Sequence, residues 1–110
     1  MSEEFHKKWR GQMLKGLLEL FIISYISINP GTYGYQILQR LRGTLVLAAD
    51  IADDPVYGVL NRLEREGVLE VTKKEAAGRM RKTFVLSSYG EGLFEKILKD
   101  WNEVRKLEKL

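Results

Sequence analysis

A helix that runs directly into a basic hairpin is the feature that most limits how this chain can fold. Residues 53–67 carry a helical pattern that stops at Gly67, a residue typical of helix ends. Two short β-compatible runs follow at residues 68–71 and 83–86. A loop that holds most of the local positive charge is expected between them. Any fold for the chain must therefore place this helix next to a cationic hairpin.

The helix at residues 53–67 has one apolar face and one polar face. Aspartate at the cap and proline at the first helical position predict its start at Asp53, Asp54 and Pro55. Its apolar positions share one side of a helical wheel: Val56, Val59, Leu60 and Leu63. The opposite side carries Gly58, Asn61 and Arg65, flanked by Tyr57 and Arg62.

Asparagine and arginine are residues that read base edges through paired hydrogen bonds, and arginine also pairs with phosphate. For this helix alone, an ordinary solvated face is an equally good interpretation. The loop at residues 73–82 changes the balance, because it holds Lys73, Lys74, Arg79, Arg81 and Lys82 against Glu75 alone. Its net charge of +4 exceeds the +3 of the whole chain. Clustered cations on a projecting loop match duplex phosphates, which are spaced at about 1.7 Å of helix axis.

The N-terminal segment, residues 2–28, is predicted to be helical. Its apolar residues occupy most of the helix circumference, which indicates burial on several sides. Two interpretations stay open with equal weight: a central core helix, or a helix partly covered by a second chain. Gly11 and Gly16 each weaken a helix by about 1 kcal/mol relative to alanine, so a break near either is compatible with the sequence.

A turn and a second helix are expected next. Asn29, Pro30 and Gly31 have turn chemistry, and Thr32 is suited to cap a helix that ends near Gly43. Gly34, near the start of this helix, leaves room for close packing. Residues 44–52 are apolar and short, and the sequence does not decide between a continued helix and an extended connection.

A long helix is predicted over residues 88–110. Ser87 or Ser88 is suited to cap it, with Glu91 placed for a capping box on Ser88. Its apolar stripe is expected to pair with a symmetry mate in a homodimer. The alternative is a terminal helix packed on its own domain. The predicted interface residues are Phe94, Ile97, Leu98, Trp101 and Val104.

These elements together predict a mainly α protein with a small β-wing (α+β), a winged helix-turn-helix with a long C-terminal dimerisation helix. In that fold the third helix enters the major groove and the wing lies along the backbone or the minor groove. The expected domains are residues 1–87, an N-terminal helix with the DNA-binding unit, and residues 88–110, the dimerisation helix.

Composition and motifs argue against other classes. The chain has no cysteine, so disulfides and thiolate zinc sites are excluded. The longest apolar stretch, residues 17–28, contains Glu19 and is shorter than the roughly 20 residues that span a bilayer. No signal-peptide pattern is seen, and a cytoplasmic location is expected. His6 is the only histidine and has no partner motif. We therefore expect no catalytic residue, metal or cofactor, and no enzyme.

Four stretches of the sequence resemble the PadR family of winged-helix transcriptional regulators. They are "LKGLLELFIISYI", "GYQIL", "VYGVLNRLEREGVLEV" and "GRMRKTFVLSSYG", which together span residues 14–90. The resemblance implies a homodimeric regulator of double-stranded DNA, usually a repressor, with a palindromic site. It also implies that Tyr35, Tyr57, Asn61, Arg62 and Arg65 lie at or near DNA and that Arg79 and Arg81 are the wing arginines. The sequence departs from the family pattern at residues 53–56, where many members have small or hydroxyl residues, and at Gly58, where they have proline.

Two further hypotheses follow. Some PadR-like dimers hold flat aromatic ligands near a tryptophan of the last helix, so Trp101 is a candidate to stack on a small aromatic effector, although such a tryptophan is more often simply packed. The rival function is a winged-helix protein-interaction module whose basic wing meets an acidic partner. The complete set of predicted DNA contacts is Tyr35, Tyr57, Asn61, Arg62, Arg65, Lys73, Lys74, Arg79, Arg81 and Lys82.

Overall fold

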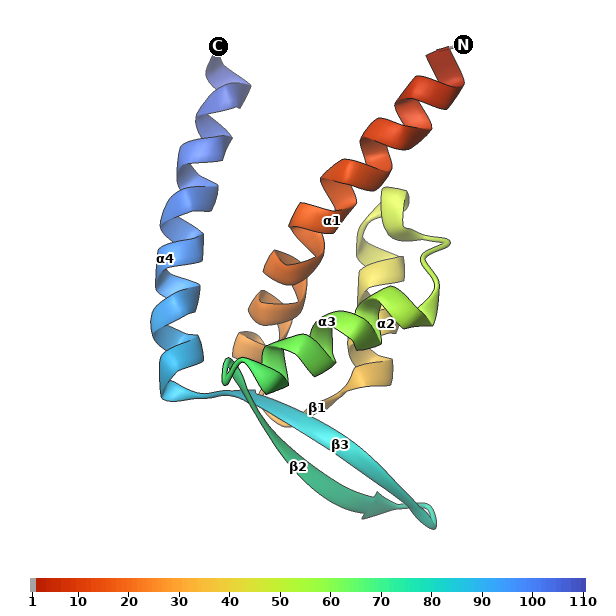
Figure 1. The fold of residues 1–110 in the computed structure, drawn as a ribbon, viewed down its shortest axis with the longest axis vertical. Helices are drawn as coiled ribbons and strands as arrows, with labels where there is room; N and C mark the ends of the chain where they lie inside the picture. The colour runs from red at the N-terminus through yellow and green to blue at the C-terminus, as the bar shows by residue number, and fades with distance from the viewer. Residues whose placement is uncertain (1) are drawn as a thin grey trace.

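Four helices and a three-stranded antiparallel sheet form the molecule (Figure 1), in a computed structural model that describes residues 2–110. The predicted fold class, mainly helical with a β-wing, is confirmed. The sheet has the order β1-β3-β2, so the expected two-stranded wing gains a short third strand. The elements are α1 (Ser2–Ile28), β1 (Thr32–Tyr33), α2 (Gly34–Thr44), the 3₁₀ helix η1 (Val46–Ala48), α3 (Asp53–Arg65), β2 (Leu69–Ala76), β3 (Arg79–Leu86), α4 (Ser88–Val104) and the 3₁₀ helix η2 (Arg105–Lys109).

The core lies where α1, α2 and α3 meet above the base of the sheet. Helices α2 and α3 each bury one apolar stripe in it, as the periodicity predicts, and the C-terminal half of α1 packs against them. The largest fully buried side chains are Ile22, Ile23, Ile26, Ile37, Leu38, Leu41, Val56 and Leu60. Gly34 is also buried. It packs so closely against Tyr57 that a Cβ atom at this position would lie only 2.7 Å from Cε1 of the tyrosine ring. The expected close packing at Gly34 is therefore confirmed.

Helix α1 runs without a break through Gly11 and Gly16. By length and composition alone, Glu3–Ile28 is long enough to cross a membrane, which corrects the expectation based on residues 17–28. Core helices pass the same test, and Ile22, Ile23 and Ile26 of α1 are fully buried against the rest of the domain. Its N-terminal half carries exposed aromatic rings at Phe5 and Trp9.

The start of α2 differs from the prediction. Thr32 does not cap the helix but lies in β1, paired with Phe84 of β3, and Tyr33 occupies the cap position. The side chain of Gln36 replaces the expected cap: its Oε1 accepts hydrogen bonds from the Tyr33 amide and the Thr32 hydroxyl, both at 2.9 Å. Of the undecided residues 44–52, Thr44 ends α2, residues 46–48 form η1, and a turn follows at residues 49–50.

Helix α3 begins at Asp53, two residues before Pro55, the predicted first helical position. Ala52 is the cap residue, and Asp53 is already helical, so Pro55 is not the first helical position. Glu66 and Gly67 end the helix as expected, with Gly67 at a φ of +78°, a conformation that glycine adopts without strain.

The wing is longer and more regular than the sequence indicates. The loop predicted over residues 73–82 is wrong, because β2 and β3 extend through these residues and only Ala77 and Gly78 form the turn. Both turn residues have positive φ, 52° and 75°, which is the geometry of a tight type I′ hairpin turn. The cationic side chains therefore lie along two paired strands and are held in register.

The junction between β3 and α4 is tied to the end of α3. Ser87, not Ser88, caps α4, because its Oγ accepts from the Gly90 amide at 2.9 Å. The same hydroxyl donates to the carbonyl oxygen of Gly67 at 2.6 Å. Gly90 is buried, and a Cβ atom there would lie 2.1 Å from the Val68 carbonyl oxygen. Only glycine fits this contact between α4 and the segment that follows α3.

Helix α4 stands beside α1 and leaves the domain at the end opposite the hairpin turn (Figure 1). It is regular to Val104 and then tightens into η2, so the predicted helix over residues 88–110 continues as a 3₁₀ segment rather than as an α-helix. Phe94 and Ile97 are partly buried against the domain's own core. Leu98 and Val104 are exposed, and Trp101 is half-buried.

Candidate nucleic-acid interface

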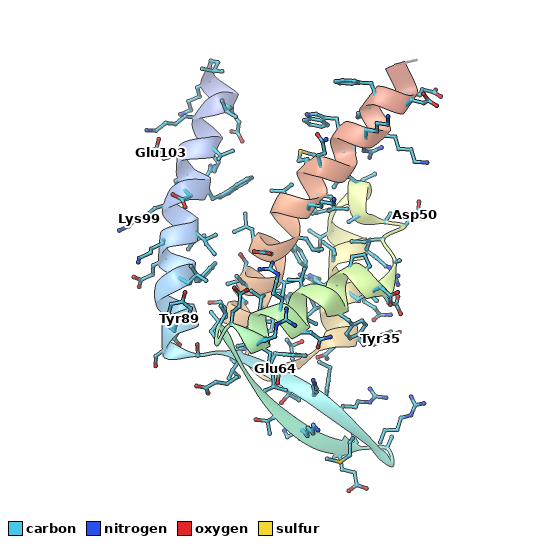
Figure 2. The ribbon with its side chains drawn as sticks, in the orientation of Figure 1. Tyr35, Asp50, Glu64, Tyr89, Lys99 and Glu103 are labelled. Atoms are coloured by element: carbon cyan, nitrogen blue, oxygen red, sulfur yellow. The ribbon has the colours of Figure 1, made fainter. Side chains whose placement is uncertain are left out.

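The outer face of α3 and the wing lie at the same end of the molecule. In Figure 2, Glu64 projects from α3 toward the hairpin, and Tyr35 at the start of α2 lies at this same end. A hollow of about 500 Å³ separates the helices from β3. Its lining combines aromatic, amide and cationic side chains from both parts: Tyr33, Tyr35, Tyr57, Asn61, Arg79, Arg81 and Lys82, with Gly34, Leu60 and Phe84 at its base. The packing thus brings six of the ten predicted DNA contacts to one concave surface.

The exposed face of α3 is the one the helical wheel predicts. Gly58, Asn61 and Arg65 are exposed, and Tyr57 is 38% exposed with its ring against Gly34. Within residues 2–110, Arg65 has no carboxylate partner at salt-bridge distance. Asn61 and Arg65 are therefore free to donate to a ligand that approaches this face.

Arg62 is placed differently from Arg65. Its guanidinium pairs with Glu19 of α1 and, at 3.1 Å, with Glu66 just past the end of α3. Arg62 is thus an ion-paired side chain at the edge of the surface, between α1 and α3.

The two faces of the wing carry different charges. Alternate residues of a strand share a face, and the register pairs Lys74 with Arg81 and Ala76 with Arg79. Toward its tip, one face therefore carries Lys74, Arg79 and Arg81, and the acid on this face, Glu70, lies four residues from Lys74 at the base of β2. The strands place cation directly opposite cation, an arrangement that destabilises a hairpin unless an anion neutralises it.

The other wing face is partly neutralised. Lys73 lies opposite Lys82 on the same side as Glu75. The ammonium of Lys82 also bonds to Oε1 of Glu64 at 3.3 Å, which links β3 to the end of α3. The positive field of the wing therefore comes mainly from Lys74, Arg79 and Arg81, whereas Lys82 ties the wing to α3.

Tyr33 is a site residue that sequence analysis missed. The Arg81 guanidinium carbon lies 5.9 Å from the centre of the Tyr33 ring, which is cation–π geometry. The pairing of Tyr33 with Thr83 in the sheet brings the two residues together. No local signal predicts this contact, because it depends on the unexpected strand β1.

The neighbouring Tyr35 is 55% exposed, and its hydroxyl accepts a hydrogen bond from Gln39 at 2.6 Å. This bond runs between residues one turn apart on α2, so it fixes the tyrosine hydroxyl on the exposed side of the helix. Tyr35 is thus presented toward the hollow with an ordered polar tip.

Carboxylates near the start of α3 are partly neutralised from within the chain. Arg42 of α2 pairs with Asp53 at 3.0 Å and also donates to the carbonyl oxygen of Ile51 at 2.6 Å. These bonds fix the segment that leads into α3 and offset one of the two negative charges that distinguish residues 53–56 from the family pattern.

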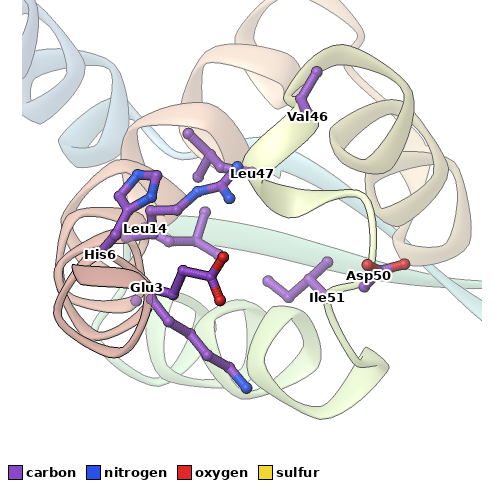
Figure 3. Close-up of a pocket in the computed structure, with 10 residues that line it drawn as sticks. Glu3, His6, Leu14, Val46, Leu47, Asp50 and Ile51 are labelled. Atoms are coloured by element: carbon purple, nitrogen blue, oxygen red, sulfur yellow. The ribbon is translucent and has the colours of Figure 1, made fainter. Parts of the chain in front are cut away.

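A second cavity, of about 570 Å³, lies between the N-terminal half of α1 and the segment that contains η1 (Figure 3). Glu3 and Asp50 with Lys7 and Arg10 give it mixed charge, His6 adds an imidazole, and Leu14, Val46, Leu47 and Ile51 supply apolar walls. Neither this cavity nor the hollow beside the wing includes Trp101. In the part of the chain that the structure describes, no three side chains of histidine, aspartate or glutamate are grouped to hold a metal ion.

Comparison with known proteins gives a consistent result. Residues 22–96 match the profile of the transcriptional regulator PadR-like family. A structure of a PadR-like transcriptional regulator from Bacillus cereus is 28% identical, with a TM-score of 0.76 over 89% of this chain and 93% of that one. A PadR-like transcription factor from Bacteroides fragilis is 25% identical, with a TM-score of 0.71 over 93% and 96% of the two chains. An uncharacterized protein X of Lysinibacillus sphaericus is 27% identical over 99 residues, covering 89% of this chain and 90% of that protein.

Proposed function

Because the chain belongs to the PadR-like family of transcriptional regulators, which are not enzymes, we propose that it is a cytoplasmic repressor that binds a palindromic DNA operator as a homodimer. The observation that carries this proposal is the hollow between α3 and the wing, where Arg79 and Arg81 have no acidic partner at salt-bridge distance among residues 2–110. Arg65, exposed on the outer face of α3, also has no such partner within these residues. Unpaired arginines on a concave end of a domain are suited to phosphates and to base edges.

The proposed contacts divide into two groups. Asn61 and Arg65 of α3 would read bases in the major groove, because they are exposed on the helix face that projects from the domain. Lys73, Lys74, Arg79 and Arg81 would bind phosphate along the wing, with Tyr35 and Tyr57 at the border between the groups. Arg62 and Lys82 lie at the same surface but are held by Glu19, Glu66 and Glu64.

Homodimerisation is proposed through α4 and the N-terminal half of α1. Leu98 and Val104 on α4 and Phe5 and Trp9 on α1 are large apolar side chains left exposed in one chain. Residues 1–87 would then form the DNA-binding unit, and residues 88–110 the dimerisation helix. A small aromatic effector that stacks on Trp101 between the subunits stays a hypothesis; it is supported only by the half-buried ring on this helix.

Selection of bound duplexes from a random pool, followed by competition, tests the proposal. A regulator should recover a palindrome with half-sites about one helical turn apart, or a multiple of it. The selected duplex should outcompete random duplex by about 10³-fold or more. Equal competition by both duplexes would instead favour the interaction-module function, in which the wing binds an acidic protein. Repeating the selection with aromatic acids present tests the effector hypothesis.

A further inference from the structure

The two arginines in the last turn of α3 are in opposite electrostatic situations. Arg65 is exposed and unpaired within residues 2–110, whereas Arg62 is flanked by the carboxylates of Glu19 and Glu66. A guanidinium between two carboxylates has less to gain from a phosphate, because it must give up an ion pair to form the new one. The sequence treats the two arginines alike, but the fold does not.

Of the two carboxylates, Glu19 is the one whose position is set by a different element. It lies on α1 one residue after the buried Leu18 and three before the fully buried Ile22. Its side chain is 38% exposed, against 57% for Glu66, which sits at the end of α3 itself. The core fixes this stretch of α1 beside α3, and this packing places the Glu19 carboxylate at the Arg62 guanidinium.

We propose that Glu19 is a positioning residue of the DNA interface: it withholds Arg62 from backbone phosphates and so limits the sequence-independent part of DNA binding. Under this arrangement Arg65 is the cation that α3 offers to DNA, while phosphate binding is left to the wing. The inference rests on the proposed function, because it requires that DNA approaches α3.

The test measures affinity for a random duplex as a function of salt concentration, using the full-length chain. Glu19→Gln keeps the shape of the side chain but removes its charge, so Arg62 retains only the more exposed Glu66 as a carboxylate partner and binds phosphate more readily. We expect affinity at about 0.1 M salt to rise by about 3- to 10-fold, and the slope of log K against log salt to steepen by about 0.9 for each additional phosphate that the protein neutralises. In an Arg62→Ala background the same substitution should have no effect.

Glu95→Gln is the matched control. Glu95 is exposed on α4 and unpaired within the described chain, so its substitution changes the net charge equally without touching Arg62. An equal gain for Glu95→Gln and Glu19→Gln would overturn the inference, because the effect would then be one of net charge alone. A gain that persists without Arg62 would overturn it as well.

A second measurement does not depend on how well the Glu19 variant folds. If Glu19 withholds Arg62, then Arg62→Ala alone should leave the salt slope of the parent protein unchanged. A flatter slope for this variant would mean that Arg62 already binds phosphate, and the inference would be wrong. Absence of binding to any duplex would instead contradict the proposed function, so the two failures are distinguishable.

Discussion

At Gly90, the addition of a single methyl group is expected to destabilise the fold strongly. Its hydrogen atoms face the Val68 carbonyl oxygen, which a Cβ atom would approach to 2.1 Å. Because backbone cannot yield as a flexible side chain does, Gly90→Ala should lower the free energy of unfolding by about 2 kcal/mol or more.

Urea denaturation at a fixed protein concentration measures this destabilisation, and Gly92→Ala provides the control. Gly92 lies in the same helix with open space around it, so alanine there should stabilise the protein by up to about 1 kcal/mol. Similar effects at both positions would show that the Gly90 contact does not constrain the junction.

Arg65 is the residue whose removal should change which DNA is bound. If it reads a base, Arg65→Ala should weaken binding to the selected duplex by about 1–3 kcal/mol and leave random binding nearly unchanged. Parallel titrations of the two duplexes measure the difference. Equal weakening of binding to the selected and the random duplex would indicate that Arg65 contacts phosphate and that other residues read the bases.

At the residue scale, the sequence predicts correctly which face of a helix is buried, but it does not predict which residue caps a helix. Helical periodicity separates buried Val56 and Leu60 from exposed Asn61 and Arg65, because burial follows the 3.6-residue repeat. For the cap of α4 the sequence offers two adjacent serines. Ser87 accepts the capping bond from Gly90, and its hydroxyl is also bound to the carbonyl oxygen of Gly67, twenty residues away. Interactions of that range leave no local trace in a sequence.

At the scale of the element, the wing should supply the salt dependence of binding. Replacing Arg79 and Arg81 with alanine should weaken selected and random complexes alike and flatten the salt slope by about 0.9 for each phosphate that is no longer neutralised. Titrations at several salt concentrations measure the slope. Lys82→Ala is a matched control, since Glu64 already holds that ammonium, and its effect on the slope should be smaller. An unchanged slope in the double variant would exclude wing–phosphate contact.

The length of the two wing strands is not predictable from the sequence pattern. The sequence predicts a loop at Lys73, Lys74, Arg81 and Lys82, because lysine and arginine in succession resemble solvated loop chemistry more than strand chemistry. They are strand residues because the hydrogen-bond ladder continues from the apolar base of the hairpin to a two-residue turn. Sequence is enough to predict that the charges gather on the hairpin, but their division between two faces depends on the register.

At the scale of the whole molecule, DNA binding should depend on association through α4. Leu98→Asp places a charge on the exposed apolar side of the helix and should shift the protein from dimer to monomer in sedimentation experiments. Lys99→Asp puts the same charge on the polar side and should leave the dimer intact. A wild-type monomer, or a Leu98 variant that stays dimeric, would contradict the proposed interface.

The architecture is predictable from sequence because the four helices and the apolar base of the hairpin carry their own periodicity and stop signals. The links between elements are not. Arg42 with Asp53, Arg62 with Glu19 and Lys82 with Glu64 join residues that are far apart in the chain, and only the packed core brings them together. These ion pairs decide which cations of the surface are free, so the detailed site follows only from the three-dimensional structure.

The junction at Ser87 and Gly90 has a consequence for the assembled molecule. Helix α4 and the residues that follow α3 share hydrogen bonds and backbone contact, so neither can tilt without displacing the other. In a dimer built on α4, the crossing angle of the two C-terminal helices would set the separation of the paired α3 helices. A change at that crossing, far from any nucleotide, would be transmitted as an altered operator spacing.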